Sequence, residues 1–289
     1  MGSKASIGGI GLAVLAGCLL PSTDGLTGAD GGSDAPIGCI DCADSGIPDV
    51  AADTRNDAVT TDAVADAPGD SAPVAFCAGL SPKPVFCEDF DSNGLFNAQF
   101  TNVHVTSKAS IGPDTVAYAS APRSLLAQLP VAVTNTDYAF LTRILGGTPT
   151  ELDYAFDVRI DSFTAAESSV LASLILGEGT AVEHAMVVVS IDGDFYLEES
   201  FLTDAGRIFK DTLIQTNALP KGTWVRVGMH VSTVTHQAKA YVGGQVVKTF
   251  PIDAAWTAAL PQIDLGFTYV AKQTSAWSAH FDNVVYDAK

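Results

Sequence analysis

Basic side chains are scarce in this sequence. It contains 15 Lys and Arg residues against 33 Asp and Glu residues, which gives a formal net charge of −18 and a pI near 4.3. A chain with this charge is repelled by polyanions, so nucleic acid and anionic surfaces are excluded as partners. Neutral glycans or a cationic protein surface fit the charge better.

The sequence also lacks a hydrophobic run of about twenty residues, the length that a membrane-spanning helix requires. A shorter apolar run begins near Ile7, after Lys4, and ends at Leu15-Ala16-Gly17-Cys18. A charged start, a short apolar stretch and a small-residue exit are typical of a secretory signal. The final four residues resemble the lipobox of bacterial lipoprotein precursors.

In lipoprotein precursors the lipobox Cys is lipidated and becomes the first residue of the mature protein. The resemblance therefore implies a signal peptide over residues 1–17 and a lipid anchor at Cys18. Leu19 stands where retention at the inner membrane usually needs Asp, which implies an outer-membrane or cell-surface location, with a periplasm-facing one as the alternative. An ordinary secretory signal, or N-myristoylation of the Met1–Ser6 pattern, are the competing interpretations.

Aromatic residues are absent from the first 75 positions. Residues 19–75 hold eleven Asp, no Glu and one basic residue, Arg55, among mostly small and polar residues. Such a segment cannot bury enough apolar surface to offset the entropy of ordering it. We therefore predict a disordered acidic tether over residues 18–75, with a root-mean-square span of roughly 40 Å.

Residues 76–289 show almost no helical periodicity, and a short helix is expected only over residues 253–260. Strand-like runs are predicted instead at residues 84–91, 124–129, 139–145, 151–163, 170–176, 185–191, 194–199, 224–234, 238–250, 263–270 and 277–287. Turn signals separate them, notably Ile191-Asp192-Gly193-Asp194 and Val242-Gly243-Gly244-Gln245. Many short strands with such turns predict one all-β domain, an antiparallel sandwich or jelly roll.

The run from Glu151 to Asp161 alternates most clearly. Leu152, Tyr154, Phe156, Val158 and Ile160 share one face, and the other face is mainly charged. Residues 224–231 alternate in the same way. Such strands are typical of antiparallel sheets with one buried and one solvated face.

Two pairs of segments resemble concanavalin A-like and laminin G-like domains. Trp224-Val-Arg-Val-Gly-Met-His-Val followed by Ala240-Tyr-Val-Gly-Gly-Gln-Val-Val is similar to their W-x-h-v strand and Y-v-D-G hairpin, with Gly243 in place of the usual Asp. Phe86-Cys-Glu-Asp-Phe90 and Phe281-Asp-Asn-Val-Val285 resemble their terminal strands, which pair with each other. The resemblance implies a concanavalin A-like jelly roll, a fold that serves lectins, glycan-binding modules, glycosidases, lyases and adhesion domains.

Catalytic motifs are missing or incomplete. The five His show no metal-binding spacing, and no G-x-S-x-G elbow occurs. Glu151-Leu-Asp153 resembles the start of the E-x-D-x-E or E-x-D-x-x-E motif of laminarinase-like glucanases, but Ala155 and Phe156 stand where the second carboxylate belongs. Asp157 lies roughly 20 Å from Glu151 along an extended strand, too far for a retaining carboxylate pair.

A carbohydrate-binding module is accordingly the leading interpretation. A structural or adhesive surface lipoprotein without a small ligand is second, and a glycan hydrolase or lyase is third. Because sugar sites in this fold combine aromatic faces with polar groups, the resemblance implies six ligand-binding candidates, each of which also suits a solvated strand face. They are Asp153, Asp157, Arg159, Trp224, Arg226 and His230.

Four cysteines remain if Cys18 is lipidated, and export to an oxidising compartment favours disulfides. Cys77 and Cys87 bracket a short loop at the start of the domain, so we predict that they are bonded. Cys39 and Cys42 form a C-x-x-C in the tether, where a local disulfide is favoured over a zinc site.

A structural calcium ion is the one cofactor that the sequence suggests. Asp89 and Asp91 lie in the first strand, with Glu88 pointing the other way, and Asp282 and Asn283 lie in the last. The family resemblance brings these strands together, and hard oxygen ligands of this kind suit Ca²⁺. Exposed turn acids or a hydrogen-bonded Asp-Asn pair are the alternatives.

Overall fold

The computed structural model describes residues 75–289, except residues 93, 107, 132–136, 164–166, 179, 181–182, 204–205 and 271–273. The predicted signal peptide, the Cys18 anchor, almost all of the tether, and Cys39 and Cys42 lie outside the described residues. Within this part of the chain no helix is long and apolar enough to cross a bilayer.

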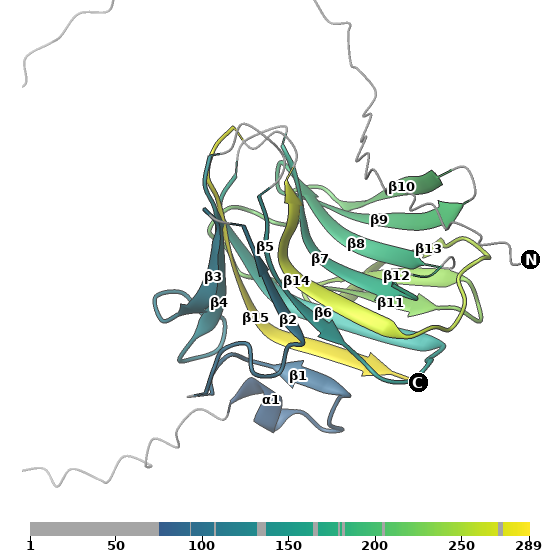
Figure 1. Ribbon diagram of the computed structural model, residues 1–289, viewed down its shortest axis with the longest axis horizontal. Coiled ribbons are helices and arrows are strands. Elements are labelled where there is room, and N and C mark those ends of the chain that lie inside the picture. The colour runs from purple at the N-terminus through teal and green to yellow at the C-terminus, as the bar shows by residue number, and fades with distance from the viewer. Residues whose placement is uncertain are drawn as a thin grey trace, which may run out of the picture. The chain divides into compact units, whose positions relative to one another are not determined.

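The described residues form two antiparallel sheets that face each other as two layers (Figure 1). Sheet A has the spatial order β13 (Gln245–Pro251), β12 (Gln237–Val242), β11 (Val225–Ser232), β6 (Glu151–Ser162), β15 (Trp277–Ala288), β4 (Ser124–Leu129), β3 (Ser110–Asp114), and β1 (Phe86–Glu88) also pairs with β15. Sheet B has the order β10 (Gly206–Gln215), β9 (Asp194–Thr203), β8 (His184–Ile191), β7 (Ser168–Leu176), β14 (Pro261–Val270), β5 (Ala139–Ile144), β2 (Asn102–Val105). The predicted all-β sandwich is confirmed.

Strand β6 lies at the centre of sheet A, and its alternation follows the prediction. Its inward residues Leu152, Tyr154, Phe156, Val158 and Ile160 are at most 1% exposed. They pack against inward residues of sheet B in one continuous core. The hydroxyl of Tyr154 donates a hydrogen bond of 2.9 Å to the backbone oxygen of Asp264 in β14, which ties the two sheets together.

The two predicted hairpin turns are present. Asp192 and Gly193 have φ values of 54° and 83°, and Gly243 and Gly244 have values of 59° and 76°. Two successive residues with positive φ are typical of the type I′ turn, whose twist matches that of the strands it joins.

Three strands were not predicted, namely β2, β3 and β10. Most residues of β10 are exposed, because it is an edge strand that buries neither face, and the period-two signal is therefore missing. Strand β3 contains Pro113, which is tolerated because β3 also lies at an edge.

The predicted helix over residues 253–260 is wrong. The segment is a turn and extended chain, fixed by Glu199 of β9, whose Oε1 accepts hydrogen bonds from the Asp253 backbone nitrogen at 2.6 Å and from Nε1 of Trp256 at 2.7 Å. Trp256 is fully buried. A short helix, α1 (Phe76–Gly79), occurs instead at the start of the described chain.

Candidate functional site

The six predicted ligand-binding residues all lie on the outer face of sheet A. Asp153, Asp157 and Arg159 point outward from β6, because each alternates with a buried residue. Arg226 and His230 do the same on β11, and Trp224 immediately precedes that strand.

The structure brings these residues together in two groups. Asp153 and His230 are opposite each other, with Oδ1 and Nδ1 3.0 Å apart, and Nη1 of Arg226 lies 3.3 Å from Oδ1 of Asp157. Arg159 and Trp224 lie further along the same face, where Arg159 pairs with Asp161 at 2.7 Å. The Trp224 ring lies 6.2 Å from that of His280, so it is separate from the first group.

The glucanase-like motif is also interrupted in the structure. Ala155 points outward at the position where a second carboxylate would stand, and Phe156 is fully buried in the core. No glycosidase pair is therefore assembled from Glu151 and Asp153 on this strand.

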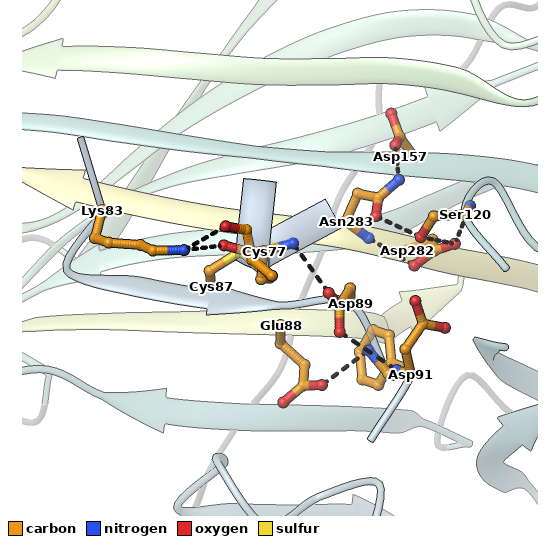
Figure 2. The surroundings of a disulfide bond; sticks show 12 residues. Cys77, Lys83, Cys87, Glu88, Asp89, Asp91, Ser120, Asp157, Asp282 and Asn283 are labelled. Carbon is orange, nitrogen blue, oxygen red and sulfur yellow. Dashed lines mark hydrogen bonds between the residues drawn. A yellow bond between two sulfur atoms is a disulfide. The ribbon is translucent and has the colours of Figure 1, made fainter. Parts of the chain in front are cut away.

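The two ends of the domain meet on sheet A. Strand β1 pairs with β15 in the register Phe86 to Tyr286, as the resemblance implied. A disulfide joins Cys77 to Cys87 and so links α1 to β1, which confirms the predicted pairing (Figure 2).

The predicted calcium ligands lie near this junction, but backbone groups already occupy most of their oxygens. Oδ2 of Asp282 accepts hydrogen bonds from the backbone nitrogens of Ala119 and Ser120, both at 2.9 Å. Oδ2 of Asp89 accepts one from Cys77 at 3.0 Å.

Asp91, the remaining acid of the predicted set, differs from its neighbour Glu88, which is not a predicted ligand. Figure 2 shows Glu88 pointing away from Asp89 and Asp91, and it accepts a hydrogen bond from the Phe90 nitrogen at 2.8 Å. Oδ2 of Asp91 is buried without a hydrogen-bond partner. In the described part of the chain no group of three or more His, Cys, Asp or Glu is arranged to hold a metal ion.

Electrostatics nevertheless leave excess negative charge at this junction. Burial raises the pKa of Asp282 to about 7 despite three backbone hydrogen bonds, and the charge of Asp91 contributes to the rise. Burial also raises the pKa of Asp91 itself. A cation beside Asp91 and Asp282 would offset the cost of desolvating their carboxylates, so calcium stays a prediction for these two residues together with Asp89 and Asn283.

The sequence did not point to the outer face of sheet B, where polar side chains line up across the strands. Directly opposite residues of neighbouring antiparallel strands lie on the same face. The register therefore places Thr142, Asp264, Ser173, Glu198 and Asp211 in one row, interrupted only by Val187. We call these five residues the sheet B polar row.

The sheet B polar row is partly buried, although every described strand belongs to one of the two sheets and none covers this face. Asp264 is 5% exposed, Thr142 3% and Ser173 4%. Around them, aliphatic side chains of the same face bury one another, among them Ala185, Val187 and Val189.

Two carboxyls of the row have strongly raised pKa values. Burial, followed by the charge of Asp211 and a hydrogen bond with it, raises the pKa of Glu198 to about 7. Burial raises the pKa of Asp264 to about 6, although Thr142 donates a hydrogen bond of 2.7 Å to it and Gln262 one of 3.2 Å. Near neutral pH the Glu198–Asp211 pair therefore retains a proton and offers both a donor and an acceptor.

Aromatic rings lie along one side of the sheet B polar row, near its two ends. His104 and Phe140 are stacked with their centroids 4.6 Å apart, and Tyr138 meets Phe140 edge-on at 5.7 Å. Phe140 is two residues from Thr142 on β5, and Tyr196 is two residues from Glu198 on β9, so both rings lie on the same face as the row. Charged and hydroxyl groups next to aromatic rings are a common composition of ligand sites.

No protein-family model and no curated protein sequence matches this chain. Solved structures do. An endo-β-1,4-glucuronan lyase from the fungus Trichoderma reesei has a TM-score of 0.56 at 14% identity, over 71% of this chain and 96% of that one. The cellulose-induced protein Cip1 has a TM-score of 0.52 at 12% identity, over 71% and 97%.

A sialidase has a TM-score of 0.51 at 16% identity over 71% of this chain, which spans 18% of the sialidase. The strand order of the two sheets and the likeness to these solved structures together establish the fold. The chain has a concanavalin A-like β-sandwich fold. At such low identity the likeness establishes the fold alone.

The raised carboxyl pKa values predict a pH dependence of stability. Protonated Glu198 is favoured in the folded state, so its contribution is fully present below about pH 4.5 and is lost as the pH rises through about 7. Glu198→Gln keeps the donor and removes the charge. At pH 8 we expect it to be more stable than wild type by on the order of 1 kcal/mol, or about 2–4 °C in Tm, and to match wild type at pH 4.

Calorimetric melting between pH 4 and 8 measures this difference. Asp211→Asn should reproduce the effect, because it removes the like charge that faces Glu198. A constant difference between Glu198→Gln and wild type across this range would contradict the raised pKa.

The calcium prediction is tested by chelation. We expect EDTA to lower the melting temperature of the wild-type chain and millimolar Ca²⁺ to restore it, because an ion that binds only the folded state stabilises it by mass action. Asp91→Asn should abolish the response, whereas Glu88→Gln, whose side chain points away, should keep it. Identical melting of wild type with and without EDTA would rule out a stabilising ion here.

Proposed function

We propose that this chain is an exported, lipid-anchored protein whose β-sandwich binds carbohydrate on the outer face of sheet B. The observation that carries the proposal is the sheet B polar row, a line of partly buried hydroxyl and carboxyl groups on a face that no described strand covers. Titratable groups whose pKa values are raised by burial are more frequent at functional sites than elsewhere.

The chemistry of this face suits sugars. Thr142, Ser173, Asp264 and the proton-sharing Glu198–Asp211 pair supply donors and acceptors at the spacing of the strands, about 4.8 Å. Sugar hydroxyls need both kinds of partner. The rings of Tyr138 and Tyr196, which lie on one side of the row near its two ends, offer flat apolar surfaces for the C–H faces of sugar rings.

The carboxyl geometry favours binding over hydrolysis. Asp264 and Glu198 are three strand positions apart, or about 14 Å, whereas glycosidase carboxyl pairs are about 5–9.5 Å apart. Glu198 and Asp211 hydrogen-bond directly, which leaves no space for a glycosidic bond between them. Neither pair has the spacing that acid–base cleavage requires.

The net negative charge of the domain favours neutral ligands over acidic ones. Residues 76–289 contain 22 acidic and 13 basic side chains. Because the sheet B polar row is itself acidic, neutral glycans fit this face better than uronic acid polymers. The named activity of the glucuronan lyase supports a polysaccharide-related role for the fold, but its acidic substrate is not carried over to this chain.

Attachment to a membrane rests on the sequence. The lipobox resemblance at Cys18 supports a lipid anchor at the outer membrane or cell surface, and the composition of residues 18–75 supports a tether that holds the sandwich away from the lipid. Such an arrangement presents a glycan-binding face to polysaccharide outside or within the envelope.

Glycan binding is tested with a glycan array and with titration of the best neutral oligosaccharide found on it. Tyr138→Ala should weaken binding by about 3- to 10-fold, the free energy of one aromatic contact. Tyr118→Ala is the matched control, because Tyr118 is 42% exposed and Tyr138 38%, but Tyr118 lies in the loop before β4. An array without any binding by wild type would favour the structural or adhesive alternative, and reducing-sugar release from neutral polysaccharides would show hydrolysis.

The anchor is tested by mass spectrometry of the N-terminus after expression in a Gram-negative host. We expect a mature chain that begins at acylated Cys18 and partitions into detergent, and Cys18→Ser should leave an unprocessed precursor. A free N-terminus at another residue would refute the lipoprotein assignment while leaving the sandwich unaffected.

A further inference from the structure

The outer face of sheet A contains a trough at its centre. Ala155 of β6 and Gly228 of β11 are directly opposite, with Val285 of β15 next to Ala155 and Tyr241 of β12 next to Gly228. A Cβ atom at Gly228 would lie 2.8 Å from that of Ala155, so only a glycine fits there. The floor is thus backbone and a methyl group, below a hollow of about 250 Å³.

Charged side chains form both walls of this trough. On one side Asp153 stands opposite His230, and on the other side Asp157 stands opposite Arg226. The two pairs are four residues apart along the strands, or about 13 Å. Between them the floor carries no charge, and Asp153, Arg226 and Tyr241 line the hollow.

The wall groups are held in place by contacts of their own. Besides its pairing with Asp157, Arg226 donates a hydrogen bond of 3.1 Å to the backbone oxygen of Asn283, and its guanidinium lies 5.2 Å from the centre of the Phe76 ring. Nε2 of His230 is 3.0 Å from Oε2 of Glu151. A donor on one wall and an acceptor, Asp153, on the other are therefore preorganised before any ligand arrives.

A second hollow of about 190 Å³ adjoins the first beyond the Asp153–His230 pair. It is lined by Glu151, His230, Ser232, Thr235, Gln237 and Lys239. Acidic and basic side chains lie next to one another around both hollows. Polyanions and polycations each meet repulsion there, whereas an uncharged molecule with many hydroxyl groups meets donors and acceptors.

We infer that this trough is a second carbohydrate site, which holds a neutral sugar ring with its apolar face on Ala155, Gly228 and Tyr241. Its hydroxyls bond to Arg226 on one side and to Asp153 on the other. The inference takes its ligand class from the proposed function but uses a different face. Because the outer faces of the two sheets lie on opposite sides of the sandwich, the two sites are separate and one domain can hold two glycan segments.

The test maps the binding of neutral hexasaccharides (cellohexaose, laminarihexaose, xylohexaose and mannohexaose) onto the ¹⁵N-labelled full chain by NMR. We expect amide shift changes in two sets, one on β6, β11 and β12 and the other on β5, β9 and β14. Ala155→Leu fills the trough, so the first set should require at least tenfold more sugar while the second is unchanged. Ala155→Ser, of nearly the same size, is the control and should keep both sets.

The possible results of this NMR experiment test the two sites independently. Changes confined to β5, β9 and β14 would overturn the trough and leave the proposed function intact, whereas changes confined to β6, β11 and β12 would support the trough and overturn the sheet B site. No change with any of the four sugars would overturn both. If Ala155→Leu fails to fold, Tyr241→Ala, which removes an end of the trough without filling it, replaces it with the same expected loss.

Discussion

The burial of alternate side chains between two sheets is the constraint on which the rest of this structure depends. In β6 the inward side chains are almost completely buried, and Tyr154 reaches across the core to the backbone of β14. A shift of one residue would exchange the two faces of the strand and place charges in the core. The register of the central strands is therefore strongly determined, and with it the position of every outward side chain.

Because the register is fixed, outward side chains of neighbouring strands lie in rows that cross each sheet. On sheet B it aligns five polar residues from five strands, and on sheet A it aligns Ala155 with Gly228 between the Asp153–His230 and Asp157–Arg226 pairs. The core thus has an indirect role in both proposed sites, because it decides which outward groups are neighbours. The rows are linear and regularly spaced, which suits an extended ligand such as a glycan chain better than a compact one.

Carboxyl groups are stabilised in different ways on the outer faces of the two sheets and at the chain ends. On sheet B, burial keeps Glu198 protonated to unusually high pH, and the proton satisfies its pairing with Asp211. On sheet A, Asp153 and Asp157 are instead paired with His230 and Arg226. At the chain ends, Asp282 relies on backbone N–H groups of the β3–β4 connection. Each solution offsets the cost of desolvating a carboxylate, either by a proton or by a fixed donor.

The sequence by itself determined the strands with one buried face, the two type I′ hairpins, the pairing of the first and last strands, and the Cys77–Cys87 bond, because local periodicity, turn chemistry and a few motifs carry that information. It did not determine the edge strands β2, β3 and β10, which lack a fully buried face, nor the chain around Trp256, which Glu199 holds from another strand. The sheet B polar row and the trough were decided only by the tertiary structure. Their members come from strands far apart in the chain, and each is an ordinary outward residue until cross-strand register makes it a neighbour of the others.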